Sequence, residues 1–424
     1  MNEHDSERMT GILEGNGCAQ AGDVESADMV ILNTCSIREK AEQKFYSELG
    51  RLKALKDGNP NLKIVVSGCI AQQEGSRILS RAPYVDIVFG PSDIVRLADM
   101  VDRNQEVSRP VVETGGDPEY HRKSIPTTRR DRIKAWVSIM YGCDNFCTYC
   151  VVPYLRGRER SRPADDIVRE VRELGARGYK EVTLLGQNVN SYGRGIERNT
   201  SFPELLGLLN GVPGIERIRF VTSHPRDLSH DLIFAMRDLP KVCESVHLPI
   251  QSGSDSVLRS MNRKYGRQEY LDKVNRLRKA VPDLALTTDI IVGFPGETEQ
   301  DLEMTLELLE EVQYDSLFAF KYSKRPETAA IKLPGHLPEE VKEERLARVL
   351  ELQKGISLRR NRELVGTVRE VLVDGFSKKG GMVTGRTREN KVVNFPGPSS
   401  LIGTVVQAVI TAAGMNSLTG QKCE

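Results

Sequence analysis

Residues 141–150, with the sequence YGCDNFCTYC, place three cysteines in one short loop. Three residues separate Cys143 from Cys147, and two residues separate Cys147 from Cys150. This spacing lets one loop wrap its sulfurs around a face of an iron–sulfur cube, so that three irons are ligated and the fourth stays open. A zinc site more often has two Cys-x-x-Cys pairs, or pairs with histidines, and no fourth ligand follows at such a spacing. The alternative is a chance grouping of buried thiols.

Size and composition are those of a globular protein without a membrane segment. The chain has 424 residues, a length typical of about three domains, with 28% charged and 39% hydrophobic residues. The formal net charge is only +1, so a nucleic-acid partner would have to meet local basic patches. The polar start and the lack of a long apolar run favour a cytoplasmic protein. In that reducing compartment the clustered thiols indicate metal ligands before disulfides.

The first part of the chain, residues 1–105, alternates short apolar runs with helical stretches. The runs at residues 29–34, 63–68 and 85–90 predict buried strands of a parallel sheet joined by crossover helices. Sites in open sheets of this kind lie at the carboxyl ends of the strands. Cys35 and Cys69 directly follow the first two runs, and this places both thiols at that edge.

The middle and the end of the chain differ in their sequence patterns. Residues 106–128 lack periodicity and indicate a linker, whereas residues 129–361 repeat strand and helix about six times. That repeat predicts an α/β domain with a partial (βα)6 barrel, its chemistry at the carboxyl strand ends. Residues 362–424 consist of short β-rich runs cut by glycines and predict a small β-barrel.

Basic residues are frequent on this last barrel. Small barrels with basic faces often bind single-stranded or looped RNA, although an ordinary solvated surface has the same composition. The residues concerned are Lys378, Lys379, Arg386, Arg388 and Lys391.

Several motifs together resemble those of the radical S-adenosylmethionine methylthiotransferase family, and the resemblance covers nearly the whole chain. The motifs occupy residues 142–157, 33–38, 67–72, 248–254 and 293–298. The resemblance implies that the terminal barrel is an RNA-binding TRAM domain. Met1, Asn2, Asp5, Ser6 and Glu7 are similar to the branch that modifies tRNA. That branch adds a methylthio group to C2 of N6-isopentenyl (dimethylallyl) adenosine at position 37, next to the anticodon.

The resemblance also implies the cofactors and their ligands. Cys143, Cys147 and Cys150 would hold a [4Fe-4S] cluster whose open iron binds S-adenosylmethionine, the source of a radical that removes hydrogen from an unreactive carbon. Cys35 and Cys69 would ligate an auxiliary [4Fe-4S] cluster that carries the sulfur to be inserted. The partners would be tRNA, a sulfur donor and an electron donor that the sequence does not identify, and we expect a monomer.

Four further residues at strand ends are candidates for binding the cofactor. They are Gln187, Gln251, Ser252 and Gly296, and for each a role in a turn or a cap is the alternative. His224 and His247 also lie near strand ends, where lone histidines are more often structural. Arg156 and Arg158, beside the cysteine loop, could bind phosphate or be solvated.

The chain departs from the family's pattern at its first residue. The family's first auxiliary-cluster cysteine would lie two residues before Met1, together with its strand, so we expect that the printed sequence starts at an internal methionine. A substitute such as Cys18 is the less favoured alternative. As printed, the chain is expected to bind the auxiliary cluster poorly. The rival functions are a ribosomal-protein aspartate methylthiotransferase and a tRNA-binding protein that has lost sulfur insertion.

Overall fold

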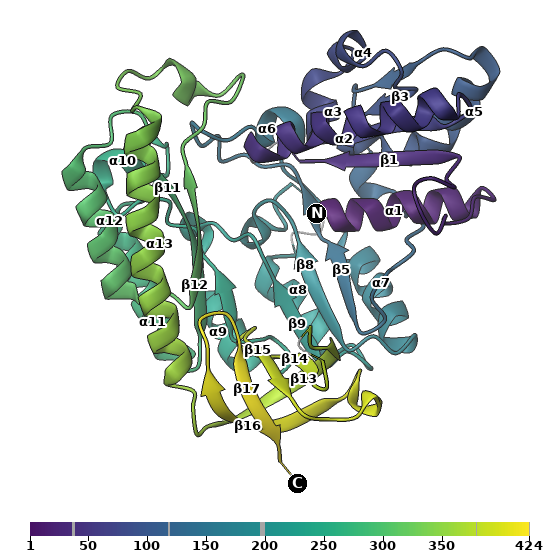
Figure 1. Cartoon of the computed structure of the whole chain (residues 1–424). Coiled ribbons are helices and arrows are strands. Elements are labelled where there is room, and N and C mark those ends of the chain that lie inside the picture. Colours follow the sequence, from purple (N-terminus) through teal and green to yellow (C-terminus); the bar gives the residue numbers. More distant parts are fainter. Residues whose placement is uncertain (36–38, 118, 196–199, 379, 424) are drawn as a thin grey trace. The chain divides into compact units, whose positions relative to one another are not determined.

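The protein folds into two compact units (Figure 1). The computed structural model describes residues 1–35, 39–117, 119–195, 200–378 and 380–423. One unit comprises Met1–Asp131, Met140–Asp144 and Val151–Pro163, and the other comprises Arg132–Ile139, Asn145–Cys150 and Ala164–Glu424. No helix in these described ranges is both long and apolar enough to span a membrane.

The first unit is built on a four-stranded parallel sheet. Its strands lie in the order β1 (Met29–Thr34), β2 (Lys63–Gly68), β3 (Ile87–Phe89) and β4 (Val111–Glu113). The predicted parallel sheet is therefore confirmed. β4 lies in the stretch interpreted as a linker, because three residues are too few to show a hydrophobic period.

Helices cover both faces of this sheet. Ile64 and Val66 of β2 pack with α2 (Glu39–Gly58), α3 (Cys69–Glu74) and α4 (Arg77–Arg81). Val65, between them in sequence, packs on the opposite face with α1 (Asn2–Gly15) and α5 (Leu97–Val107). Side chains alternate across a strand, and a sheet covered on both faces therefore needs the continuous apolar runs seen in the sequence.

Among its described residues, the second unit contains six parallel strands, each followed by one or more helices. One sheet has β5 (Lys134–Ser138), β8 (Glu181–Leu185) and β9 (Arg217–Phe220), and the other has β10 (Ser245–His247), β11 (Ala285–Val292) and β12 (Ser316–Lys321). Between them, an isolated parallel bridge pairs Ile218 of β9 with Val242, which lies just before β10. The helices are α7 (Ala164–Ala176), α8 (Phe202–Asn210), α9 (His230–Asp238), α10 (Asp255–Ser260), α11 (Arg267–Ala280), α12 (Glu299–Val312) and α13 (Glu339–Arg362). This is the predicted partial barrel.

Three short elements flank the cysteine loop in the first unit. β6 (Met140–Tyr141) pairs antiparallel with β7 (Arg160–Ser161), and α6 (Val152–Leu155) precedes β7.

The end of the chain forms a closed β-barrel, as predicted. Its order is β13 (Val368–Phe376), β14 (Val383–Thr387), β15 (Val392–Phe395), β17 (Leu418–Lys422) and β16 (Val405–Ala413). Its core contains Val371, Val373, Phe395 and Ile410, all fully buried.

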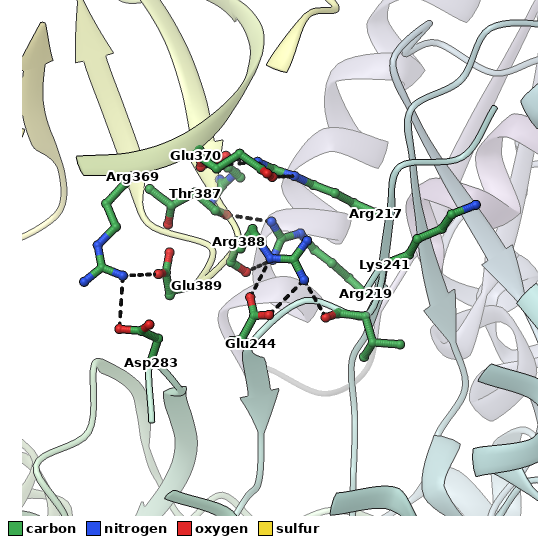
Figure 2. Close-up of polar contacts among 12 residues, drawn as sticks. Arg217, Arg219, Lys241, Glu244, Asp283, Arg369, Glu370, Thr387, Arg388 and Glu389 are labelled. Carbon is green, nitrogen blue, oxygen red and sulfur yellow. Dashed lines mark hydrogen bonds and ion pairs between the residues drawn. The ribbon is translucent and has the colours of Figure 1, made fainter. Parts of the chain in front are cut away.

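Two arginines of β9 attach this terminal barrel to the partial barrel (Figure 2). Arg217 donates to the carbonyl of Arg386 at 2.7 Å and to the carboxylate of Glu370 at 2.8 Å. Arg219 donates to the carbonyls of Thr387 and Arg388, each at 2.7 Å. The two side chains are only 1% and 7% exposed, so these charge-assisted bonds replace the water that each guanidinium loses.

The other contacts of the terminal barrel fall at the beginnings of further strands. Arg388 binds both oxygens of Glu244, just before β10, at 2.8 Å, and Arg369 binds Asp283, before β11, at 3.1 Å (Figure 2). Lys391 pairs with Asp315, before β12, at 2.6 Å. The terminal barrel therefore closes the amino-terminal end of the partial barrel.

These contacts change the interpretation of the basic residues. Arg388 and Lys391 are held by carboxylates of the same chain, and Arg386 donates to Asn390 at 3.2 Å. They do not form a free basic face. Lys378 is exposed, and Lys379 lies outside the described residues.

Replacing Arg219 by methionine should destabilise the second unit. The substitution leaves Glu181, its ion-pair partner at 2.9 Å, buried without a cation, and breaking a buried pair costs about 3–5 kcal/mol. Amide hydrogen exchange in β9 and residues 386–391 measures the loss.

The matched control is Arg237→Met, which breaks the exposed pair with Asp238 and should cost less than about 1 kcal/mol. Equal effects of the two substitutions would contradict the role given to Arg219.

Candidate functional site

The cysteine loop is divided between the two units. Cys143 belongs to the first unit, where its amide donates to the carbonyl of Gly157 at 3.2 Å. Gly142 has a φ of +74°, and a Cβ there would lie 2.1 Å from the carbonyl oxygen of Arg158. Only glycine fits this approach. Cys147 and Cys150 belong to the second unit and are partly exposed.

A buried arginine lies beside Cys147. The Nη1 of Arg263 donates to the Cys147 sulfur at 3.4 Å, while its other nitrogens donate to the carbonyl of Pro249 at 2.7 Å and to the hydroxyl of Tyr265 at 2.6 Å. A guanidinium keeps its charge when buried, so at this position it would stabilise any negative charge that the sulfur carries. Arg263 could not be recognised from the sequence, because no motif marks its position.

Polar atoms without hydrogen-bond partners gather after the strands of the partial barrel. Within the described residues, the unpartnered buried atoms include Gln187 Oε1, Asn188 Oδ1, Ser223 Oγ, His224 Nε2 and Gln251 Oε1. The first two follow β8, the next two follow β9, and the last follows β10. Such atoms cost about 1–3 kcal/mol each unless a ligand or water binds them. These donors and acceptors fit a polar cofactor at the carboxyl strand ends.

Gln251 and Ser252 form a strained turn. Gln251 has a φ of +77°, which is unfavourable for a residue with a side chain and is common at functional sites. Its backbone pairs with Asp289 and Ile291 at 2.9 Å. Ser252 is buried, and its hydroxyl accepts from the amide of Ser254 at 3.2 Å. This bond shows the hydroxyl of Ser252 taking part in the turn itself.

Gly296 is needed for its backbone conformation. Its φ is +79°, and a Cβ built there meets no atom within 4 Å. The amide of Gly296 donates to the carbonyl of Gly335 at 2.9 Å.

His224 is held as a neutral donor. Its Nδ1 accepts from the amide of Arg226 at 3.2 Å, so the neutral ring carries its hydrogen on Nε2, the unpartnered atom. Burial lowers the pKa of His224 to about 2, and the nearby charge of Arg263 adds to the shift.

Cys35 and Cys69 follow neighbouring strands of the first unit. Thr34 and Gly68 are register partners at the ends of β1 and β2. Gly68 has a φ of +95°, and a Cβ there would lie 2.3 Å from the carbonyl oxygen of Thr34. Glycine thus lets the two strand ends approach each other. Residues 36–38, part of the first strand-end motif, lie outside the described residues.

Arg156 supplies a second buried cation, and it is not solvated. It pairs with Asp5 at 3.1 Å. Burial opposes its charge, but Asp5 and the thiol group of Cys69 raise the pKa of Arg156 above its usual value. Arg158, by contrast, is exposed and pairs with Asp144 at 2.9 Å.

No group of three His, Cys, Asp or Glu side chains able to hold a metal ion occurs among the described residues. The structure brings Cys35 and Cys69 to adjacent strand ends, and it divides the three loop cysteines between its units. The ligand sets given in the sequence analysis remain predictions.

Comparison with known proteins gives the family. The model of the Radical SAM superfamily matches residues 137–309, that of Uncharacterized protein family UPF0004 matches residues 1–90, and that of the TRAM domain matches residues 362–423. The tRNA-2-methylthio-N(6)-dimethylallyladenosine synthase of Thermodesulfovibrio yellowstonii is 51% identical over 420 residues, which cover 99% of this chain and 96% of that protein. This chain belongs to the radical SAM methylthiotransferase family.

A second relative and a solved structure are also similar to this methylthiotransferase chain. The synthase of the same name from Acetivibrio thermocellus is 51% identical over 99% of this chain and 88% of its own length. Among solved structures, the radical S-adenosylmethionine methyltransferase TsrM from Kitasatospora setae has a TM-score of 0.57 at 14% identity, covering 88% of this chain and 76% of that one. At this identity the likeness shows the fold alone.

Replacing His224 should flatten the dependence of stability on pH. The pKa of His224 is lowered in the folded chain, so below about pH 6.5 only the unfolded chain binds the proton and stability falls as the pH falls. The slope for one such group is up to about 1.4 kcal/mol per pH unit. His224→Gln should lose less stability than the original chain between pH 7 and pH 5, measured by hydrogen exchange in β9 and β11.

His230→Gln is the control, because His230 is exposed in the same unit. If His224→Gln loses as much stability on acidification as the original chain, the buried neutral ring is not the cause.

Proposed function

We propose that this chain is a tRNA methylthiotransferase. Its reaction would add a methylthio group to C2 of N6-isopentenyl (dimethylallyl) adenosine at position 37, giving 2-methylthio-N6-dimethylallyladenosine in the cytoplasm. The observation that carries the proposal is 51% identity over nearly the whole length of a protein named for this product. The TRAM match at residues 362–423 supports tRNA as the partner.

Cys143, Cys147 and Cys150 are the proposed ligands of a [4Fe-4S] cluster. With S-adenosylmethionine bound, the cluster supplies a radical strong enough to remove hydrogen from an aromatic carbon. Arg263 would offset the negative charge at Cys147, where its guanidinium lies at 3.4 Å. Thr148 fixes the loop next to it, since its amide donates to the carbonyl of Met261 at 3.1 Å.

The strand-end residues are proposed to bind S-adenosylmethionine. Gln187 and Gln251 each offer a buried acceptor without a protein partner, and His224 offers a donor. These groups match the amino, hydroxyl and carboxylate groups of a polar cofactor. Ser252 and Gly296 would act by shaping the turns that carry them, Ser252 through its hydroxyl and Gly296 through its backbone amide.

Cys35 and Cys69 are the proposed ligands of the auxiliary cluster. The side chain of Asn2 donates to the carbonyl of Thr34 at 3.0 Å, so α1 begins at these strand ends. Cys18 follows the other end of this 14-residue helix, roughly 20 Å away. Because the described part of the site offers two thiols, we propose that the second cluster is weakly held in the chain as printed.

Iron content after anaerobic reconstitution tests the ligand sets. The chain should hold about four irons, and replacing Cys143, Cys147 and Cys150 by alanine should remove nearly all of them. Cys18→Ala is the control and should leave the content unchanged. Near eight irons per chain would contradict the weak second site, and unchanged iron in the triple variant would contradict the loop assignment.

Mass spectrometry of tRNA nucleosides tests the reaction. Cells that lack their own methylthiotransferase should regain 2-methylthio-N6-dimethylallyladenosine when they express this chain, and the triple cysteine variant should not restore it. Methylthiolated aspartate in a ribosomal protein, or tRNA bound without a methylthio product, would identify one of the two rival functions instead.

A further inference from the structure

One face of the sheet β10–β11–β12 is left open by the helices. Along β11 the buried side chains are those of Leu286, Thr288, Ile290 and Val292. Thr287, Asp289 and Ile291, which alternate with them, are only partly buried. Alternate residues of a strand point to opposite faces, so the second set lies on the inner face of the partial barrel.

The register extends this inner face to the neighbouring strands. His247 of β10 is the partner of Thr287, and Phe318 of β12 is the partner of Asp289. Two residues further along, and so on the same face, Phe320 is the partner of Ile291. The inner face thus carries polar groups near β10 and aromatic rings on β12.

Direct contacts hold this set together. The Nδ1 of His247 lies 2.9 Å from the hydroxyl of Thr287, and its Nε2 lies 3.4 Å from a carboxylate oxygen of Asp289. The His247 ring also meets Phe318 edge to face, with centroids 6.3 Å apart. The imidazole therefore orients both the carboxylate and the aromatic ring.

Phe318 is unusual because it is 54% exposed on a concave inner face. Exposure of this apolar ring to water is unfavourable, and a ligand that covered it would gain free energy of binding. The neighbouring Asp289 is an acceptor only. The combination suits a flat ligand with an apolar group and one hydrogen-bond donor.

We propose that this inner face binds the prenylated adenosine. Phe318 would pack against the base and its five-carbon prenyl group, and Asp289, oriented by His247, would accept a hydrogen bond from the N6–H group. This inference rests on the proposed function and deepens it. The position is suitable because the carbonyl of Asp289 accepts from the amide of Gln251 at 2.9 Å, which places the base next to the proposed cofactor residues.

Binding of two matched RNAs to the full chain tests the inference. The probes are anticodon stem-loops that carry either N6-isopentenyladenosine or plain adenosine at the target position. Their binding to the chain is measured by fluorescence anisotropy. The original chain should prefer the prenylated RNA, and Phe318→Ala should reduce that preference at least tenfold, since each buried methylene contributes roughly a factor of four. Asp289→Leu should weaken both RNAs alike, because both bases carry an N6–H.

Phe234→Ala is the matched control. Phe234 is also a largely exposed phenylalanine, 46% exposed, but it lies on α9 outside the inner face, and its removal should leave the preference unchanged. Phe318→Leu should retain part of the preference, which separates loss of apolar contact from misfolding. A full preference in Phe318→Ala, or no preference in the original chain, would overturn the inference. The nucleoside product assay, which needs no such preference, decides the proposed function separately.

Discussion

Two guanidinium groups on one strand, those of Arg217 and Arg219, determine which end of the partial barrel remains available. Both are buried and both donate to carbonyls of the 386–388 segment. A buried guanidinium is stable only when its donors are satisfied, and here a neighbouring domain supplies the acceptors. The amino-terminal end of the barrel is closed in this way. A ligand of the partial barrel is therefore expected at the carboxyl strand ends, where several buried polar atoms of the described residues lack partners.

The same separation explains why polar groups at the two ends differ in their bonding. Glu244, Asp283 and Asp315, at the beginnings of strands, are all paired with residues of the terminal barrel. Gln251 and His224, at the carboxyl ends, retain buried atoms without partners. A fully paired network rigidifies a junction, whereas an incomplete one is costly unless a ligand completes it. The structure places the rigid network at the closed end and the incomplete one at the site.

Much of this fold could be predicted from the sequence, because strands covered on both faces require apolar runs and the cysteine loop is a local pattern. Most of the features that could not be predicted from the sequence depend on contacts between residues that are distant in the chain. Arg388 looked like part of an RNA-binding surface, but it binds Glu244, a residue 144 positions away. The placement of His247 beside Phe318 likewise follows from the register of three strands, which local sequence does not reveal. β4 was missed because three residues carry no period.

The two units share one electrostatic arrangement around their cysteines. In the second unit Arg263 contacts the sulfur of Cys147 and is held by Pro249 and Tyr265. In the first unit Asp5 holds Arg156 in place, and Cys69 also raises the pKa of Arg156. Thiolates that ligate iron bring negative charge into a poorly hydrated site. Arginine stays protonated even there, whereas a buried lysine or histidine readily loses its proton. An arginine fixed by neighbouring acceptors therefore acts electrostatically on a thiol in each unit, where it would offset the negative charge of the proposed cluster.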